Sequence, residues 1–152
     1  MTDAPSTEVL SAPHALAYAY RRSVGPVLGR FFTELRDRKL VGSRTADGRV
    51  LVPPMEYDPS TGAANDEIVA VGPAGSVTSW CWVADPLRLH PLDRPFAFAL
   101  IRLDGADTAM LHAVDAGDES QMSTGMRVVP RWSDEPTGSI LDLACFEPEV
   151  GR

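Results

Sequence analysis

The sequence predicts a mainly β protein in which an OB-type barrel follows an N-terminal helical arm and a short ribbon without metal ligands. Six short runs after Asp66 alternate in polarity and are separated by turn-forming segments, as the strands of a small barrel are. The stretch "PVLGRFFTELRDRKL" has an apolar face at the helical period. These patterns divide the chain into a disordered tail at 1–13, a helical arm at 14–41, a ribbon at 42–64 and a barrel at 65–149.

The helical arm is expected to contain two helices. The run "HALAYAYRRSV" predicts a short first helix, which ends at Gly25-Pro26. Pro26 suits the first turn of a second helix, and Gly42 follows a last turn rich in Arg and Lys. The apolar face of the second helix contains Val27, Leu28, Phe31, Phe32 and Leu35. We expect this face to cover the ribbon or the barrel, because most apolar stripes of helices belong to the core.

The ribbon segment reads "GSRTADGRVLVPPMEYDPSTG" from Gly42 to Gly62. It has the outline of a zinc ribbon, with two short turns that bracket a Val-Leu-Val strand and a Pro-Pro corner. It contains no cysteine, whereas a structural zinc ion requires four Cys or His ligands. We therefore expect the ribbon to hold its shape without a metal.

The barrel is predicted from runs of strand-like residues. These runs are "EIVAV", "SVTSWCWVA", "FAFALIRL", "TAMLHAV", "MRVVPRW" and "ILDLACF". The stretch "LIRLDGADTAML" is the clearest hairpin, with Asp104-Gly105 opening its turn. Trp80 and Trp82 lie on one face of a strand, where aromatic rings of OB folds can stack on nucleic-acid bases. The acidic surroundings favour packing or a protein interface for these two rings instead.

Charge is divided unevenly along the chain. The residues up to Arg49 carry eight Lys or Arg against five Asp or Glu, whereas the remainder carries six against sixteen, and the whole chain has a net charge of −7. An acidic barrel repels a phosphate backbone, so we expect no nucleic-acid partner. The basic arm leaves a cationic surface for a protein partner. Its residues expected to contact that partner are Arg21, Arg22, Arg36 and Arg38.

Composition is that of a soluble globular protein, with 44% hydrophobic and 23% charged residues. No apolar run approaches the roughly 20 residues of a membrane span. The start of the chain also lacks the basic and apolar regions of a signal peptide. We expect a cytoplasmic protein without a membrane partner, in which Cys81 and Cys145 are unpaired and buried.

No catalytic motif is found in the sequence. The Gly-rich phosphate loops, the GxSxG nucleophile elbow and the HExxH metal motif are all absent. His14, His90 and His112 lie in three different settings, and none has a nucleophile nearby in the sequence. The residues therefore predict a protein that is not an enzyme by itself and that needs no cofactor.

The order of these segments resembles a known family. The helix "RFFTELRDRKL", the ribbon, and then "GSVTSWCWV", "RPFAFALIRLDGADT", "GMRVVPRW" and "ACFEP" are similar to the zinc-ribbon/OB-fold proteins that accompany thiolase-like enzymes. The resemblance covers about residues 26–149. Gly48-Arg49, Pro53-Pro54, Pro59 and Gly62 stay in register with the family's ribbon.

The resemblance implies that four zinc-ligand positions have been vacated. These positions fall on Arg44, Asp47, Asp58 and Thr61. One interpretation is that Arg44 meets Asp47 and Asp58 in a charged cluster that holds the two turns together. The alternative is that these are unrelated surface charges that contribute little to stability.

The resemblance also implies an accessory function. Such proteins are non-catalytic subunits that form hetero-oligomers with thiolases or thiolase-like aldolases acting on acyl-CoA thioesters. The stretch "DRPFAFALIRLDGADT" is most similar to the actinobacterial steroid side-chain degradation branch, in which related domains are fused to MaoC-like hydratases. Two alternatives stay open: a nucleic-acid-binding OB protein, and a free-standing acyl-CoA-binding protein, which would need arginines such as Arg88, Arg94 or Arg102 to converge on the CoA phosphates.

Overall fold

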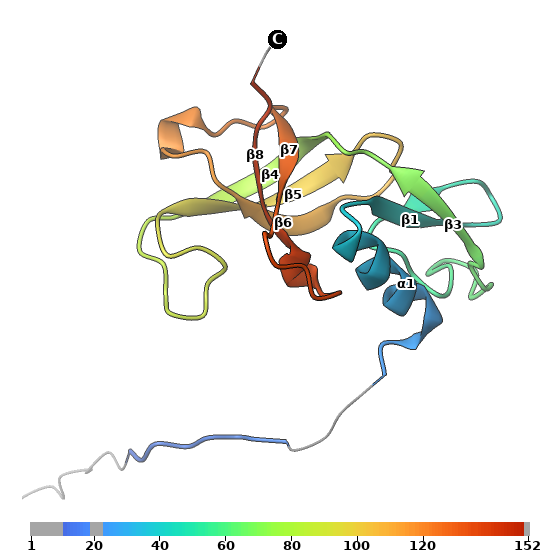
Figure 1. Ribbon diagram of the computed structural model, residues 1–152, viewed down its shortest axis with the longest axis horizontal. Helices are drawn as coiled ribbons and strands as arrows, with labels where there is room; N and C mark the ends of the chain where they lie inside the picture. Colours follow the sequence, from blue (N-terminus) through green and yellow to red (C-terminus); the bar gives the residue numbers. More distant parts are fainter. Residues whose placement is uncertain (1–10, 19–22, 151–152) are drawn as a thin grey trace, which may run out of the picture.

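The C-terminal half of the chain forms a closed five-stranded barrel in the computed structural model, which describes residues 11–18 and 23–150 (Figure 1). The order around the barrel is β4-β5-β6-β8-β7, and this arrangement confirms the predicted OB fold. Its strands are β4 (Gly75–Val83), β5 (Phe96–Leu103), β6 (Met110–Val114), β7 (Arg127–Trp132) and β8 (Leu143–Pro148). A parallel contact between Val114 of β6 and Phe146 of β8 helps to close the barrel.

The interior of the barrel is filled by alternate residues of its strands. On β5, Ala97, Ala99 and Ile101 are buried in the main core. Trp80 and Trp82 of β4 are paired with Ala99 and Ala97 and pack against this core, so large rings lie opposite small side chains. The two tryptophans therefore serve packing, as the sequence indicated.

The ribbon is a separate three-stranded antiparallel sheet with the order β2-β1-β3. Its strands are β1 (Leu40–Arg44), β2 (Val50–Leu51) and β3 (Glu67–Val71). The run "EIVAV" therefore belongs to the ribbon, although the predicted boundary placed it in the barrel. All five of its residues pair with β1, from Leu40 opposite Val71 to Arg44 opposite Glu67, and this full register decides the assignment.

A single helix, α1 (Gly25–Arg36), packs against β1 and against the short 3-10 helix η2 (Ile140–Asp142). Phe31 and Leu35 are buried, with 1% and 0% of their surface exposed, so the predicted apolar face covers the core. The predicted first helix is not observed, because residues 11–18 are exposed and not helical, while 19–22 lie outside the described residues. A helix this short is not stable from helix propensity alone and needs a surface to pack against.

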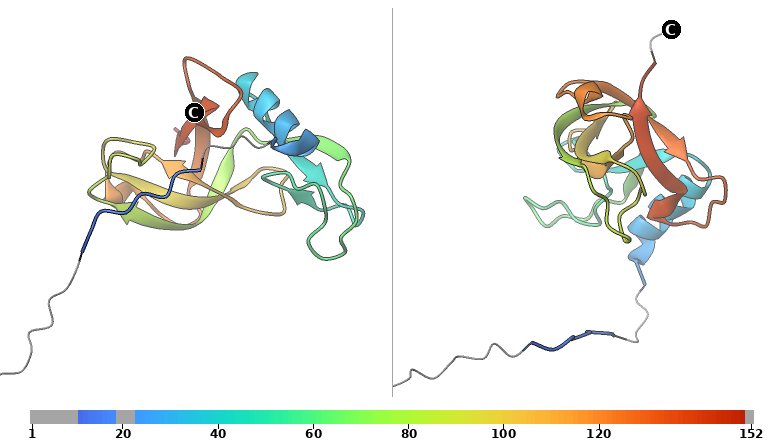
Figure 2. Two further views of the ribbon diagram at one scale, coloured as in Figure 1. Left: turned by 90° about the horizontal axis from the view of Figure 1, so that it is seen from below. Right: turned by 90° about the vertical axis from the view of Figure 1, so that its left-hand side faces the viewer.

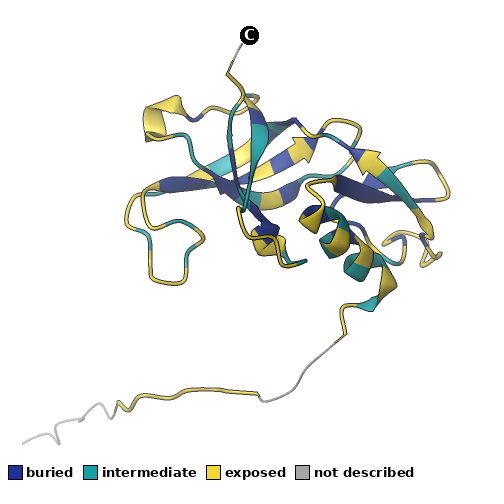
Figure 3. Ribbon diagram, in the orientation of Figure 1, coloured by how far each residue is buried: buried dark blue, intermediate teal, exposed yellow. Residues whose placement is uncertain are grey.

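The ribbon and the barrel lie beside each other, and buried segments occur in both (Figures 2 and 3). They share one hydrophobic core and a hydrogen-bonded junction. Asp107 lies in the β5–β6 connection; its Oδ2 accepts from Val50 N at 2.7 Å, and its own N donates to Val50 O at 2.9 Å. Thr108 Oγ1 accepts from Val52 N at 2.7 Å and donates to Val52 O at 3.0 Å. The barrel thus closes the outer edge of β2.

None of the described helices is long and apolar enough to cross a membrane.

Candidate functional site around the ribbon

Two tight turns lie at one end of the ribbon, at the places where the sequence predicted them. In the first turn, Gly48 N donates to Thr45 O at 2.9 Å. In the second, Gly62 N donates to Asp58 O at 2.8 Å. Gly48 and Gly62 have φ values of 91° and 72°, a region that glycine adopts without a steric penalty.

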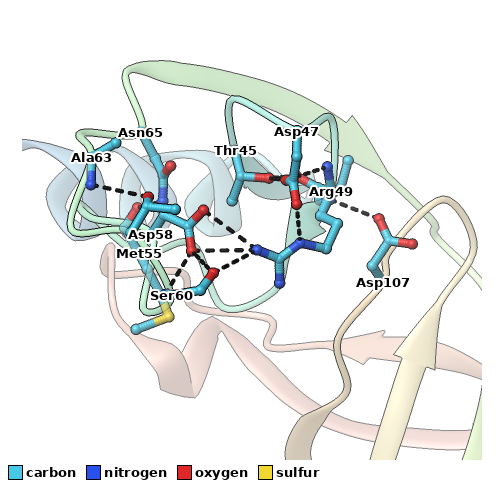
Figure 4. A network of polar contacts seen from close by, with 11 residues as sticks. Thr45, Asp47, Arg49, Met55, Asp58, Ser60, Ala63, Asn65 and Asp107 are labelled. Atoms are coloured by element: carbon cyan, nitrogen blue, oxygen red, sulfur yellow. Dashed lines mark hydrogen bonds and ion pairs between the residues drawn. The ribbon is translucent and has the colours of Figure 1, made fainter.

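Arg49 joins the two turns (Figure 4). Its Nε donates to Asp47 Oδ2 at 2.8 Å within its own turn. Its Nη2 lies 3.3 Å from Asp58 Oδ1 and 3.0 Å from Ser60 Oγ in the other turn. A charged cluster does hold the turns together, with Arg49 at its centre.

The expectation that Arg44 would meet Asp47 and Asp58 is therefore wrong. Arg44 Nε instead pairs with Glu67 Oε1 at 3.2 Å, and Arg44 Nη1 donates to Gly48 O at 3.3 Å. The physical reason is strand register, because Arg44 stands directly opposite Glu67 in the β1–β3 pair. The signal that could have identified the right residue was the Gly48-Arg49 pair, which was already in register with the family's ribbon.

Both carboxylates of this cluster remain charged at neutral pH. The Thr45 hydroxyl and then Arg49 lower the pKa of Asp47. Hydrogen bonds from Ser60 lower the pKa of Asp58, whose side chain is 3% exposed. Ser60 N donates to Asp58 Oδ1 at 2.8 Å, so the turn itself supports this charge.

The four vacated positions do not fit a structural zinc ion. Arg44 points toward β3, Thr61 Oγ1 accepts from Ala63 N at 3.3 Å within its own turn, and the two aspartates are bound to Arg49. A cation placed between the turns would have to displace a guanidinium that already supplies a positive charge there.

The second turn is supported from behind by Asn65. This residue is 1% exposed, its N donates to Glu56 O at 2.8 Å, and its Nδ2 donates to Met55 O at 3.2 Å. Met55 N in turn donates to Ser43 Oγ of β1 at 2.9 Å. Neutral hydrogen bonds thus position the second turn, and Arg49 links it to the first turn.

The arginines predicted to contact a partner are only partly described. Arg21 and Arg22 lie outside the described residues. Arg36 is exposed at the last turn of α1, and its Nε lies 3.8 Å from Asp37 Oδ1. Arg38 is exposed just after the helix, with a φ of 58°.

Arg38 also borders a groove of about 430 Å³ between α1 and the ribbon, which we call the basic groove. Its helix side carries Arg30, Glu34, Arg38 and Lys39. Its ribbon side is apolar and consists of Leu40, Val41, Ile68, Ala70, Val71 and Pro73. The convergence of Arg30, Arg38 and Lys39 on one groove depends on how α1 lies on the ribbon, which the sequence alone does not show.

A second, apolar groove of about 270 Å³ lies on the outer surface of the barrel. It is lined by Pro91, Phe98, Leu111, His112, Ala113, Ile140, Leu141, Leu143 and Ala144. Leu111 and Leu141 remain 63% and 72% exposed there. Burial lowers the pKa of His112 below the usual 6.5, and its Nδ1 is buried without a hydrogen-bond partner among the described residues.

The described histidines and cysteines do not form a nucleophile–base pair. His112 packs edge-on against Phe146, with ring centres 5.6 Å apart, and His90 Nδ1 accepts from Leu87 N at 3.0 Å. Burial raises the pKa of the Cys145 thiol to about 11. Cys81 is exposed rather than buried, because it points away from the barrel interior that Trp80 and Trp82 fill.

Asp115, Cys145 and Glu147 bring three potential metal-ligand atoms within 4.8 Å of one another. Two arginines already neutralise the carboxylates. Arg131 Nη1 lies 2.8 Å from Glu147 Oε1 and 3.2 Å from Asp115 Oδ2, and Arg94 pairs with Asp115 as well. The cluster is thus an ion-pair network beside a protonated thiol.

Arg94 and Arg102, two of the arginines considered for a CoA site, do not converge. Arg94 precedes β5 and is paired with Asp115, whereas Arg102 lies near the other end of that strand. Arg102 is six positions after Phe96 on β5, which corresponds to roughly 20 Å along an extended strand.

The barrel is similar to domains of known proteins. Residues 68–133 match the family model of the C-terminal OB-fold domain of ChsH2. A chain of the structure described as the "Ltp2-ChsH2(DUF35) aldolase" is 23% identical, with a TM-score of 0.64 over 86% of this chain and 100% of that one. A DUF35-family protein of unknown function from Sulfolobus solfataricus is also 23% identical, with a TM-score of 0.56 over 70% and 78% of the two chains.

No match is found among curated proteins. The two structural likenesses show the fold, and the family model matches most of the barrel together with β3. The chain is therefore similar to the C-terminal OB-fold domain of ChsH2 over residues 68–133, and it shares its fold with the two solved structures.

Proposed function

We propose that the chain is a non-catalytic accessory subunit of a thiolase-like enzyme that acts on acyl-CoA thioesters. The observation that carries this proposal is the match of residues 68–133 to the OB-fold domain of ChsH2. The structural likeness to a chain from the Ltp2-ChsH2(DUF35) aldolase spans that entire chain and supports the same assignment. In this role the chain stabilises the partner and shapes the partner's substrate site.

The chemistry of the described residues supports a non-catalytic role. A nucleophilic cysteine requires a lowered pKa, whereas the pKa of Cys145 is raised to about 11. A general base requires a pKa near the working pH and a nearby nucleophile, whereas His112 packs against Phe146 and its pKa is lowered by burial. A thiolase-like partner supplies its own nucleophile and oxyanion hole.

The partner we favour is an aldolase of steroid side-chain degradation. Support comes from the stretch Asp93–Thr108, whose residues are similar to that branch of the family, and from the structural likeness to a chain of the Ltp2-ChsH2(DUF35) aldolase. A MaoC-like hydratase is a second candidate for the same complex.

Coexpression with a thiolase-like aldolase tests the proposal. We expect a stable hetero-oligomer, acyl-CoA turnover by the complex, and no thiolase, aldolase or hydratase turnover by the chain alone. Turnover by the isolated chain would refute the accessory role.

The basic arm is expected to contribute to the contact. Replacing Arg21 and Arg22 together by Glu, or Arg36 and Arg38 together by Glu, should weaken the complex without unfolding the barrel, because surface charges contribute little to folding. The control is Arg88→Glu, a single charge reversal at an exposed arginine of the β4–β5 loop, outside the arm. Normal assembly of both double variants would place the contact on the barrel instead.

The apolar groove of the barrel favours one alternative function. Its volume of about 270 Å³ and its apolar lining suit part of an acyl chain, so the chain could bind an acyl-CoA without a partner. Calorimetry of the isolated chain with CoA thioesters of increasing acyl length tests this alternative. An affinity that rises with acyl length and falls in Leu111→Glu would favour it over the accessory role.

A further inference from the structure

We propose that the basic groove is a docking site for an extended, acidic segment of the partner protein. Carboxylates of the segment meet Arg38 and its neighbouring cations, and apolar side chains of the segment lie on the ribbon side of the groove. The segment belongs to the partner of the proposed function. Binding is measured on the isolated chain, so either proposal can fail without the other.

Charge makes the groove suited to an acidic ligand. It carries three cations and a single carboxylate, although the whole chain has a net charge of −7. Glu34 Oε1 lies 3.7 Å from Arg30 Nε, and Glu34 Oε2 lies 4.0 Å from Lys39 Nζ, so these two cations have only weak ion pairs. No hydrogen bond or ion pair of the Arg38 side chain occurs within the described part of the chain, so this guanidinium can donate hydrogen bonds to a carboxylate.

The backbone of Arg38 is a second, independent observation. Arg38 N donates to Leu35 O and Lys39 N donates to Glu34 O, both at 2.9 Å, which ends the helix with a left-handed residue. Glycine is the usual residue at this position because a side chain makes a φ of 58° unfavourable. A non-glycine residue held in this conformation at the rim of a groove points to a role for its side chain.

A peptide segment fits the groove better than a small anion or a nucleic acid. β3 is an edge strand of the ribbon, and no strand pairs with its outer edge in the ranges that the structure describes. Ile68 and Ala70 of this strand line the groove, so an extended segment there finds free main-chain groups and an apolar surface together. A long polyanion would also approach the acidic barrel, which repels it.

The test uses the full chain and two fluorescein-labelled peptides of eight residues. One alternates Glu and Val, and the other alternates Gln and Val. Anisotropy titrations should give a dissociation constant for the Glu-Val peptide of about 1 mM or lower. The Gln-Val peptide should bind roughly tenfold more weakly.

Arg38→Gly separates binding from folding. Glycine suits the left-handed backbone, so the midpoint of thermal unfolding should stay the same or rise. Affinity for the Glu-Val peptide should fall roughly tenfold, because the cation without a pairing partner is gone. The matched control is Arg88→Gly, an exposed arginine in the β4–β5 loop, which should leave peptide affinity unchanged.

Three results would overturn the proposal. The first is failure of the Glu-Val peptide to bind, and the second is equal affinity of Arg38→Gly and the wild type. The third is that inorganic phosphate or a single-stranded oligonucleotide displaces the labelled peptide as well as the same concentration of unlabelled Glu-Val peptide does. Displacement by phosphate would indicate a general anion site, and displacement by the oligonucleotide would indicate a nucleic-acid site.

Discussion

Arg49 links two turns that are nine or more residues apart in the sequence, through Asp47 on one side and Asp58 on the other. A guanidinium suits this position because its planar fork donates in several directions at once. Asp58 is almost fully buried, so its charge depends on the hydrogen bonds that surround it. The link between the turns is therefore ionic and directional.

We predict that Arg49→Met lowers the midpoint of thermal unfolding, because it leaves the buried Asp58 carboxylate without its cation. Arg44→Met serves as the control. Its ion pair with Glu67 joins side chains that are 40% and 61% exposed, and such pairs contribute little. Differential scanning fluorimetry of the two variants checks this prediction, and an equal effect of both would contradict it.

We predict that His112 makes the stability of the barrel depend on pH. Burial lowers the pKa of His112 in the folded chain, whereas the unfolded chain binds a proton near the usual 6.5. The unfolded state therefore gains more protons as the pH falls below about 6.5, and the free energy of unfolding decreases. The hydrogen bond from Arg127 lowers the pKa of Asp104. Such carboxylates lose their contribution to stability only when the pH falls below their ordinary pKa of 3.8.

Urea unfolding at pH 7.5 and pH 5.5 checks the role of His112. The wild type should be less stable at the lower pH, and His112→Leu should show a smaller difference between the two conditions. His14→Ala, which changes an exposed histidine, should retain the full difference. An unchanged difference in His112→Leu would assign the pH dependence to other groups.

At the scale of elements, α1 is attached to the molecule through its buried face. We predict that Leu35→Ala lowers the free energy of unfolding by about 2–5 kcal/mol, because it leaves a cavity at a fully buried position. Leu141→Ala is the matched control, since Leu141 is 72% exposed and loses little on truncation. Urea titrations of both variants check the prediction, and a small effect of Leu35→Ala would mean that the helix adds little to stability.

Strand periodicity identified most of the elements. The run "FAFALIRL" coincides with β5, because its alternation reflects one face in the core and one outside. The run "ILDLACF" was only partly right, since Ser139 and Asp142 form a capping box that makes its first residues a 3-10 helix. Local capping chemistry competes with alternation there.

The features that the sequence did not reveal depend on tertiary placement. Periodicity cannot assign a strand to one of two sheets, so "EIVAV" was placed in the barrel until its register with β1 was known. Which arginine reaches Asp58 depends on the direction of side chains after a turn. The basic groove arises only when α1 lies on the ribbon, because its cations and its apolar side come from different elements.

At the scale of the whole molecule, we expect the ribbon to keep its fold without a metal. We predict that the purified protein contains no stoichiometric zinc and unfolds at the same temperature with and without a chelator, because Arg49 occupies the space between the turns. Elemental analysis and thermal unfolding in EDTA check this prediction. About one zinc ion per chain, or a lower unfolding temperature in EDTA, would contradict it.

The junction between ribbon and barrel has a consequence for stoichiometry. Asp107 and Thr108 seal the β2 side of the ribbon, whereas the β3 side has no strand beside it in the described ranges. A sheet with two open edges can polymerise, because each copy can receive one neighbour and donate to another. Because one edge is sealed, the sheet can pair with an added strand at its β3 edge only. This mode of association is therefore limited to one added strand per chain, and filaments cannot grow through both edges.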